Sequence, residues 1–141
     1  MKLNWPEWMR SWFAGRMDRS GVHEYGFSQA DRIIHRLDLF MMKRKPFLQS
    51  RYTLRELSED IGFPAYQISA IIHLRKRMNF SEYLNKLRIQ HCKRLIHASS
   101  GRKVNIRDLL VASGFHRRST FNNAFKKFTG FTPSEYIKLN W

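Results

Sequence analysis

Residues 114–136 read GFHRRSTFNNAFKKFTGFTPSEY. Within this stretch Phe121, Phe125 and Phe128 recur at three- and four-residue spacing, which predicts a helix over about 117–128 with an aromatic inner face. Gly130 is placed to end that helix in a left-handed conformation. Residues 132–135, TPSE, combine an N-cap hydroxyl, a proline at the first helical position and a capping-box glutamate. A last helix is therefore predicted near 133–139.

The rest of the chain carries the same kind of signal. Apolar residues recur at helical spacing, and strand-like alternation is nearly absent. Capping patterns begin at Ser28, Thr53 and Asn79, whereas Pro46 and Gly62 are typical helix terminators. The fold class is therefore predicted to be all-α, with further helices over residues 1–17, 28–45, 53–61, 64–77, 79–98 and 105–113.

Part of the sequence is repeated. The residues Arg55, Leu57, Gly62 and Phe63 recur 52 positions later, and the triplet SEY at 81–83 recurs 53 positions later at 134–136. Each copy predicts a short helix, a Gly-Phe turn and a longer helix rich in basic and amide side chains, which is the helix-turn-helix plan. We expect two helix-turn-helix subdomains joined by a long linker helix, with an extra N-terminal helix.

These patterns divide the chain into five segments. Residues 1–27 are a tryptophan-rich segment and linker, and 28–51 are an N-terminal helix and connector. Residues 52–78 form the first helix-turn-helix, 79–103 the linker helix and a loop, and 104–141 the second helix-turn-helix and C-terminal helix.

The amino-acid composition limits which classes of binding partner and which cellular location are expected. The chain has 141 residues, 43% of them hydrophobic, with a formal net charge of +15 and one cysteine. Residues 64–141 alone carry 15 basic and 3 acidic side chains. Such a charge attracts nucleic acid or an anionic membrane face. A single cysteine excludes an internal disulfide framework and fits a reducing compartment, and no signal peptide or membrane span is recognised, so we expect a cytoplasmic protein.

Residues 114–136 resemble, throughout, the signature GF-x(4)-F-x(3)-FK-x(3)-G-x-TP-x-x-Y of the AraC/XylS-type bacterial transcription regulators. Phe80, Tyr83, Leu87, Arg88 and Leu95 also match the linker-helix pattern of that family. The resemblance covers residues 52–139, and from about residue 25 it extends to the subgroup fused behind sensor regions. The sequence departs from the family pattern at four positions. The family often has Phe at Ile72, Gly at Arg77, and Ala at Cys92 and Leu110.

The resemblance implies a DNA-binding function without catalysis, cofactor or metal, and it places groove-facing side chains on the second helix of each module. Arg bonds guanine, and Asn bonds adenine, through paired hydrogen bonds in the major groove. The alternative is that these side chains form solvated helix faces. The base-contact candidates are Tyr66, Gln67, Ser69, Ala70 and His73 in the first module, and Arg118, Ser119, Asn122 and Asn123 in the second.

Basic side chains beside these helices are candidates for phosphate contacts. They are Arg75, Lys76, Arg77, Arg102, Lys103, Arg117, Lys126 and Lys127. Arg88 lies in the linker helix with an apolar flank, so we expect it to form a structural ion pair with Glu56 or Asp108 rather than to contact DNA.

The leading prediction is a transcription regulator that binds double-stranded DNA sequence-specifically and reads the major groove with two recognition helices. We expect it to act as an activator. Its candidate partners besides DNA are RNA polymerase, a second copy of the chain and a sensor domain. One alternative is a non-specific architectural or membrane-surface basic protein, and another is an alkyl-accepting DNA-repair enzyme that uses Cys92. The stripe Trp5, Trp8 and Trp12 could pack on the body or a second protomer, or lie on a membrane surface.

Overall fold

The computed structural model describes residues 28–140. The predicted helix over 1–17 and its tryptophan stripe lie outside this range. Residues 28–140 contain seven α-helices, one short 3-10 helix and no strand, which confirms the all-α prediction. The elements are α2 (Gln29–Arg44), η1 (Pro46–Leu48), α3 (Leu54–Ile61), α4 (Ala65–Lys76), α5 (Phe80–Ala98), α6 (Ile106–Ala112), α7 (Arg118–Thr129) and α8 (Pro133–Leu139).

Local capping chemistry sets most of these helix ends. Helices α2, α3, α5 and α8 each begin with a complete capping box, in which the N-cap side chain and the carboxylate three residues later satisfy each other's backbone N–H groups. Helix α3 ends at Gly62 and α7 at Gly130, both in the left-handed conformation. Helix α4 ends at Arg77, which is also left-handed, with φ 59°. This is the position at which the resembled family often has glycine.

Two hydrophobic cores lie along the single helix α5. The first core gathers α2, η1, α3, α4 and the first half of α5, around Leu37, Leu57 and Ile71. The second gathers α6, α7 and the second half of α5, around Cys92, Phe121 and Phe125. Helix α5 therefore contributes Tyr83 and Leu84 to one core and Ile89, Cys92 and Ile96 to the other.

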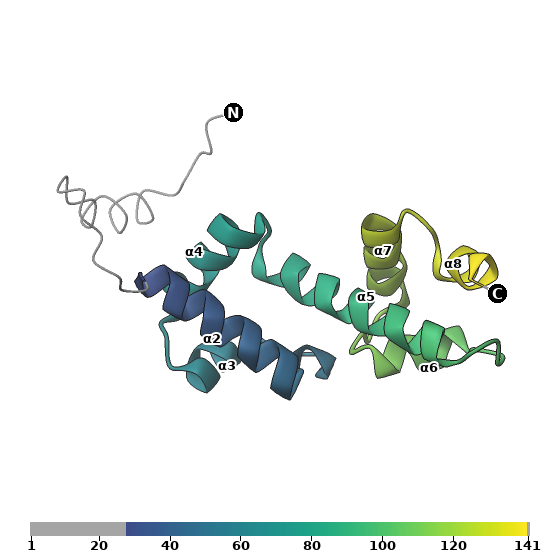
Figure 1. The fold of residues 1–141 in the computed structure, drawn as a ribbon, viewed down its shortest axis with the longest axis horizontal. Coiled ribbons are helices and arrows are strands. Elements are labelled where there is room, and N and C mark those ends of the chain that lie inside the picture. Colours follow the sequence, from purple (N-terminus) through teal and green to yellow (C-terminus); the bar gives the residue numbers. More distant parts are fainter. Residues whose placement is uncertain (1–27, 141) are drawn as a thin grey trace, which may run out of the picture.

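The modules occupy the two ends of α5 (Figure 1). In that view α4 and α7 lie on one side of α5, and α3 and α6 lie on the other. Each module thus places its second helix on the same side of the linker helix. Within residues 28–140, no helix combines the length and the apolar character needed to cross a membrane.

Candidate nucleic-acid interface

Helix α7 is strongly two-sided. Phe121 and Phe125 are fully buried, and the ring of Phe121 packs edge-on against Phe115 and Phe125, with centroids 5.3 Å and 5.8 Å apart. The aromatic face leaves the remaining face of the helix to polar residues. The predicted base-contact residues of this module all lie there: Arg118, Ser119 and Asn123 are exposed and Asn122 is half-buried.

Helix α4 is covered on most of its circumference, because α2 and α3 both pack on it. Two of its predicted base-contact residues are buried, Ala70 at 0% and Gln67 at 7% exposure. The expectation that these two face the groove is wrong. The amide oxygen of Gln67 instead accepts a hydrogen bond from Nε2 of Gln29, 3.3 Å away on α2.

The other three candidates on α4 share one face. Tyr66, Ser69 and His73 are spaced i, i+3 and i+7, which places them on one side of an α-helix. Tyr66 is 49% exposed, and Ser69 and His73 are half-buried. The outward surface of α4 is therefore narrower than that of α7 and contains one hydroxyl, one phenol and one imidazole.

Three of the predicted phosphate contacts are paired with carboxylates. Arg75 lies 2.8 Å from Asp31, and Lys76 lies 3.0 Å from Asp38, both on α2. Lys127 lies 2.9 Å from Glu82, at the start of α5. No local sequence pattern indicates these pairs, because each joins residues about 40 positions apart. The remaining candidates are exposed and form no ion pair with another described residue: Arg77, Arg102, Lys103, Arg117 and Lys126.

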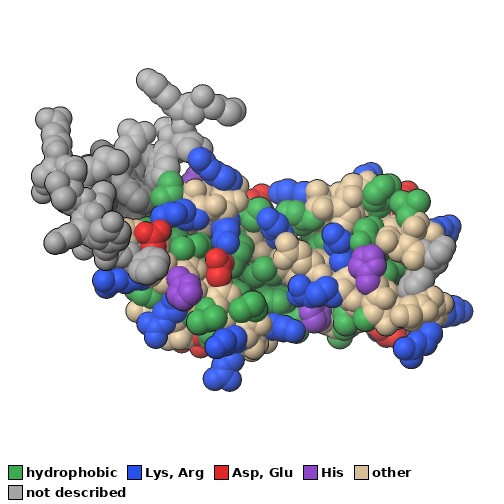
Figure 2. All heavy atoms as spheres, in the orientation of Figure 1, with side chains coloured by type: hydrophobic (Ala, Val, Ile, Leu, Met, Phe, Trp, Pro, Cys, Tyr) green, Lys and Arg blue, Asp and Glu red, His purple; other side chains and the backbone are tan. Residues whose placement is uncertain are grey.

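The visible face of the molecule is dominated by positive charge. Figure 2 shows lysine and arginine side chains over the whole length of the described part, with few acidic side chains among them. No group of three or more His, Cys, Asp or Glu residues that could hold a metal ion occurs in residues 28–140. Charge-assisted binding of a polyanion is the chemistry that this surface supports.

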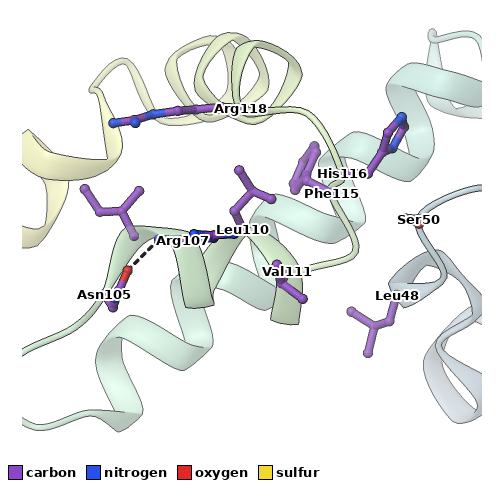
Figure 3. A pocket seen from close by; sticks show the side chains of 10 residues that line it. Leu48, Ser50, Asn105, Arg107, Leu110, Val111, Phe115, His116 and Arg118 are labelled. Atoms are coloured by element: carbon purple, nitrogen blue, oxygen red, sulfur yellow. Dashed lines mark hydrogen bonds between the residues drawn. The ribbon is translucent and has the colours of Figure 1, made fainter.

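A cavity of about 870 Å³ lies between the connector, which joins α2 to α3, and the second helix-turn-helix module (Figure 3). Leu48 and Ser50 line it from the connector, and Arg107, Val111 and Arg118 are among the residues that line it from α6 and α7. Among the residues that the structure describes, no carboxylate lines it, so the charged side chains found there are all cationic. Sequence reasoning missed this cavity because its walls come from residues more than 50 positions apart.

Arg88 does not form the predicted ion pair with Glu56 or Asp108. Arg88 as a residue is 8% exposed, and its guanidinium donates from Nε to the carbonyl oxygen of Phe47 at 2.6 Å and from Nη2 to that of Gln49 at 3.0 Å. Burial lowers the pKa of Arg88 from its ordinary value. Arg88 instead bonds backbone carbonyls of the segment between α2 and α3, and sequence patterns do not reveal such acceptors.

Comparisons with known proteins agree with this architecture. A family model described as "Helix-turn-helix domain" matches residues 57–139. The melibiose operon regulatory protein of Escherichia coli (strain K12) is 26% identical over 88 residues, which are 62% of this chain and 28% of that protein. An uncharacterized HTH-type transcriptional regulator of Staphylococcus aureus (strain MSSA476) is 31% identical over 84 residues, 60% of this chain and 11% of that protein.

A solved structure shares the fold. The C-terminal domain of AraT, a response regulator from Geobacillus stearothermophilus, superposes with a TM-score of 0.65 at 24% identity, over 79% of this chain and 88% of that one. The chain thus spans less than a third of the length of the two curated relatives but nearly all of a solved C-terminal domain. The family model covers more than half of the chain, and the two relatives are an operon regulatory protein and a helix-turn-helix-type transcriptional regulator. The chain belongs to the helix-turn-helix family of transcription regulators of the AraC/XylS type.

Proposed function

We propose that this protein binds double-stranded DNA sequence-specifically to regulate transcription, with α4 and α7 each entering a major groove. The observation that carries the proposal is the outward face of α7, where Arg118, Asn122 and Asn123 stand opposite a buried aromatic face. Guanidinium and amide groups are the side chains that read guanine and adenine through paired hydrogen bonds. The aromatic packing beneath them holds the helix rigidly enough to present these groups in register.

Phosphate neutralisation supplies the sequence-independent part of the binding energy in this proposal. The exposed cations that form no ion pair with another described residue, Arg117 and Lys126 among them, flank α7 at its two ends. Cations in these places set the height and orientation of a recognition helix in the groove. Arg75, Lys76 and Lys127 contribute less, because each already faces a carboxylate within 3.0 Å.

The first module reads DNA through fewer contacts. Its outward face is limited to Tyr66, Ser69 and His73, since Gln67 and Ala70 are buried. We therefore propose that α7 supplies most of the base discrimination and that α4 supplies a shorter second block. The further partners stay predictions: RNA polymerase, a second copy of the chain and a sensor domain. A sensor input is supported by the response regulator whose C-terminal domain has this fold.

The experiment is selection from a pool of random duplexes near physiological salt, followed by sequencing. We expect two enriched blocks whose centres lie about one helical turn apart, roughly 34 Å, with the stronger block assigned to α7. The assignment uses the double variant Arg118→Ala/Asn122→Ala, which should lose the stronger block and keep the weaker one. Strong, salt-sensitive binding without any enriched sequence would overturn the proposal in favour of a non-specific architectural protein.

A further inference from the structure

The connector between α2 and α3 touches both halves of the molecule. The ring of Phe47 is buried in the first core, at 3% exposure. Its carbonyl oxygen accepts a short hydrogen bond from Arg88 Nε, 2.6 Å away on α5. A second guanidinium nitrogen of Arg88 holds the carbonyl of Gln49 at 3.0 Å. One buried side chain of the linker helix therefore holds two backbone carbonyls of the connector.

The second module contacts the same segment of backbone. Gly114, in the turn between α6 and α7, lies so close to the connector that an added Cβ would collide with the carbonyl oxygen of Phe47 and stand 2.8 Å from Cα of Leu48. The neighbouring Phe115 places its ring 5.6 Å from the guanidinium carbon of Arg88. Phe115 itself belongs to the second core. Arg88 thus lies between a backbone anchored in one core and a ring anchored in the other.

The contacts of Arg88 and Gly114 with the connector form a junction between the two modules. This junction restricts relative motion of the modules that the linker helix alone would allow. If α5 were the only connection, the modules could twist or bend relative to each other through small changes along its 19 residues. The contact of Gly114 with the connector adds a second attachment at the turn that leads directly into α7. A displacement of that turn would move Arg118 and the rest of the recognition face with it.

We infer that Arg88 and Gly114 are positioning residues that fix the spacing and rotation between α4 and α7, and so determine which separation of two DNA half-sites the protein accepts. This inference rests on the proposed function. The repeat shows that the contact is not a requirement of the module itself. Gly62, the equivalent glycine of the first module, has no atom of the described part of the chain within 4 Å of the place where its Cβ would stand.

The test compares Gly114→Ala and Arg88→Met with Gly62→Ala. The control has the same left-handed strain, φ 75° against 86°, without the neighbouring backbone. The probes are the selected two-block duplex, the same duplex with the spacer changed by one or two base pairs, and a duplex with the stronger block alone. Each added base pair rotates one block by about 35° relative to the other, so a rigid protein should reject it.

We expect the wild type and Gly62→Ala to lose roughly tenfold in affinity for each base pair by which the spacer is changed, comparable to one mismatched base pair. Gly114→Ala and Arg88→Met should lose affinity for the original spacing, keep the affinity for the single block and show a flattened dependence on spacer length. Variants that keep the wild-type spacing profile would overturn the inference, as would a wild type that selects two blocks and ignores their spacing. A wild type without sequence preference would overturn the proposed function as well.

A second measurement does not depend on DNA. Spin labels at Glu59→Cys on α3 and Lys138→Cys on α8, both exposed, report the distance between the modules, while the native Cys92 is fully buried. We expect one narrow distance distribution in the wild type and in Gly62→Ala, and a broadened or shifted one in Gly114→Ala and Arg88→Met at unchanged helix content. Identical narrow distributions in all four proteins would show that α5 alone sets the geometry and would overturn the inference.

Discussion

Gly62 and Gly114 stand at equivalent positions of the two repeats and both have positive φ, 75° and 86°, but only Gly114 is packed against a distant backbone. The same residue type therefore serves two purposes. At Gly62 the left-handed conformation at a helix end is enough to favour glycine. At Gly114 the absence of a side chain also lets the connector approach at Phe47 and Leu48.

Substitution should separate these two purposes. Gly62→Ala forces a Cβ into the left-handed region at a cost of about 1–2 kcal/mol. Gly114→Ala adds a steric conflict with backbone, which should bring the loss in the free energy of unfolding to about 3 kcal/mol or more. Urea denaturation followed by circular dichroism measures both values. Gly130→Ala, at φ 81° with open space around it, should behave like Gly62→Ala. Equal losses at all three glycines would show that the close approach has no energetic consequence.

Arg118→Ala should change specificity as well as affinity. Loss of one bidentate base contact costs about 1–3 kcal/mol and relaxes the preference at one position of the site. Fluorescence anisotropy with the selected duplex and its single-position variants checks this prediction. A uniform loss on every duplex would reassign Arg118 to a phosphate contact.

Lys126 and Lys127 provide a matched pair of adjacent lysines. Lys126 is exposed and has no ion pair with a described residue, whereas Lys127 lies 2.9 Å from Glu82. Lys126→Ala should weaken binding to all sequences and lower the slope of log K against log salt by about 0.9. Lys127→Ala should lower the slope less, because its charge is already partly neutralised. The opposite order would place Lys127 on the phosphate backbone and Lys126 away from it.

The ion pair of Glu82 with Lys127 predicts a pH dependence of stability. The ammonium of Lys127 and the backbone N–H of Asn79 hold the pKa of Glu82 below its ordinary value of 4.5. The unfolded chain therefore binds a proton first as the pH falls, so the stabilisation is complete above pH 4.5 and is lost as the pH falls through the lowered pKa. Glu82→Gln keeps a cap acceptor and removes the charge.

The stability difference between wild type and Glu82→Gln should accordingly be largest at neutral pH and shrink below pH 4.5. Thermal unfolding from pH 7 to pH 3 at low salt measures it. A difference that stays constant over this range would mean that the carboxylate charge contributes nothing.

Cys92 offers a test of the enzyme alternative. The thiol is fully buried, and burial raises its pKa to about 11, so little thiolate exists at neutral pH. Labelling with a thiol-reactive dye should be slow in the folded protein and fast in urea. Rapid labelling of the folded protein would revive a role for Cys92 as an alkyl acceptor.

Helix boundaries were predictable because the signals are local. The capping boxes at Thr53, Asn79 and Thr132 connect residues three apart, and their hydrogen bonds form as soon as the helix does. The aromatic spacing of Phe121 and Phe125 likewise determines which face of α7 is buried, and with it where Arg118 and Asn123 point. The outward face of α7 could therefore be predicted from residues within a single helix.

The outward face of α4 and the contacts of Arg88 and Gly114 with the connector could not be predicted in this way. Gln67 and Ala70 are buried on a helix that is covered from several sides, and Arg88 bonds carbonyls about 40 residues away. Backbone carbonyls are present at every residue, so no sequence pattern marks the ones that a distant guanidinium will reach. The helical spacing of apolar residues and the capping residues specified the helices and the outward side of α7. Contacts between segments far apart in the chain decided which helices cover α4, which lysines are paired with carboxylates and how firmly the two modules are held together.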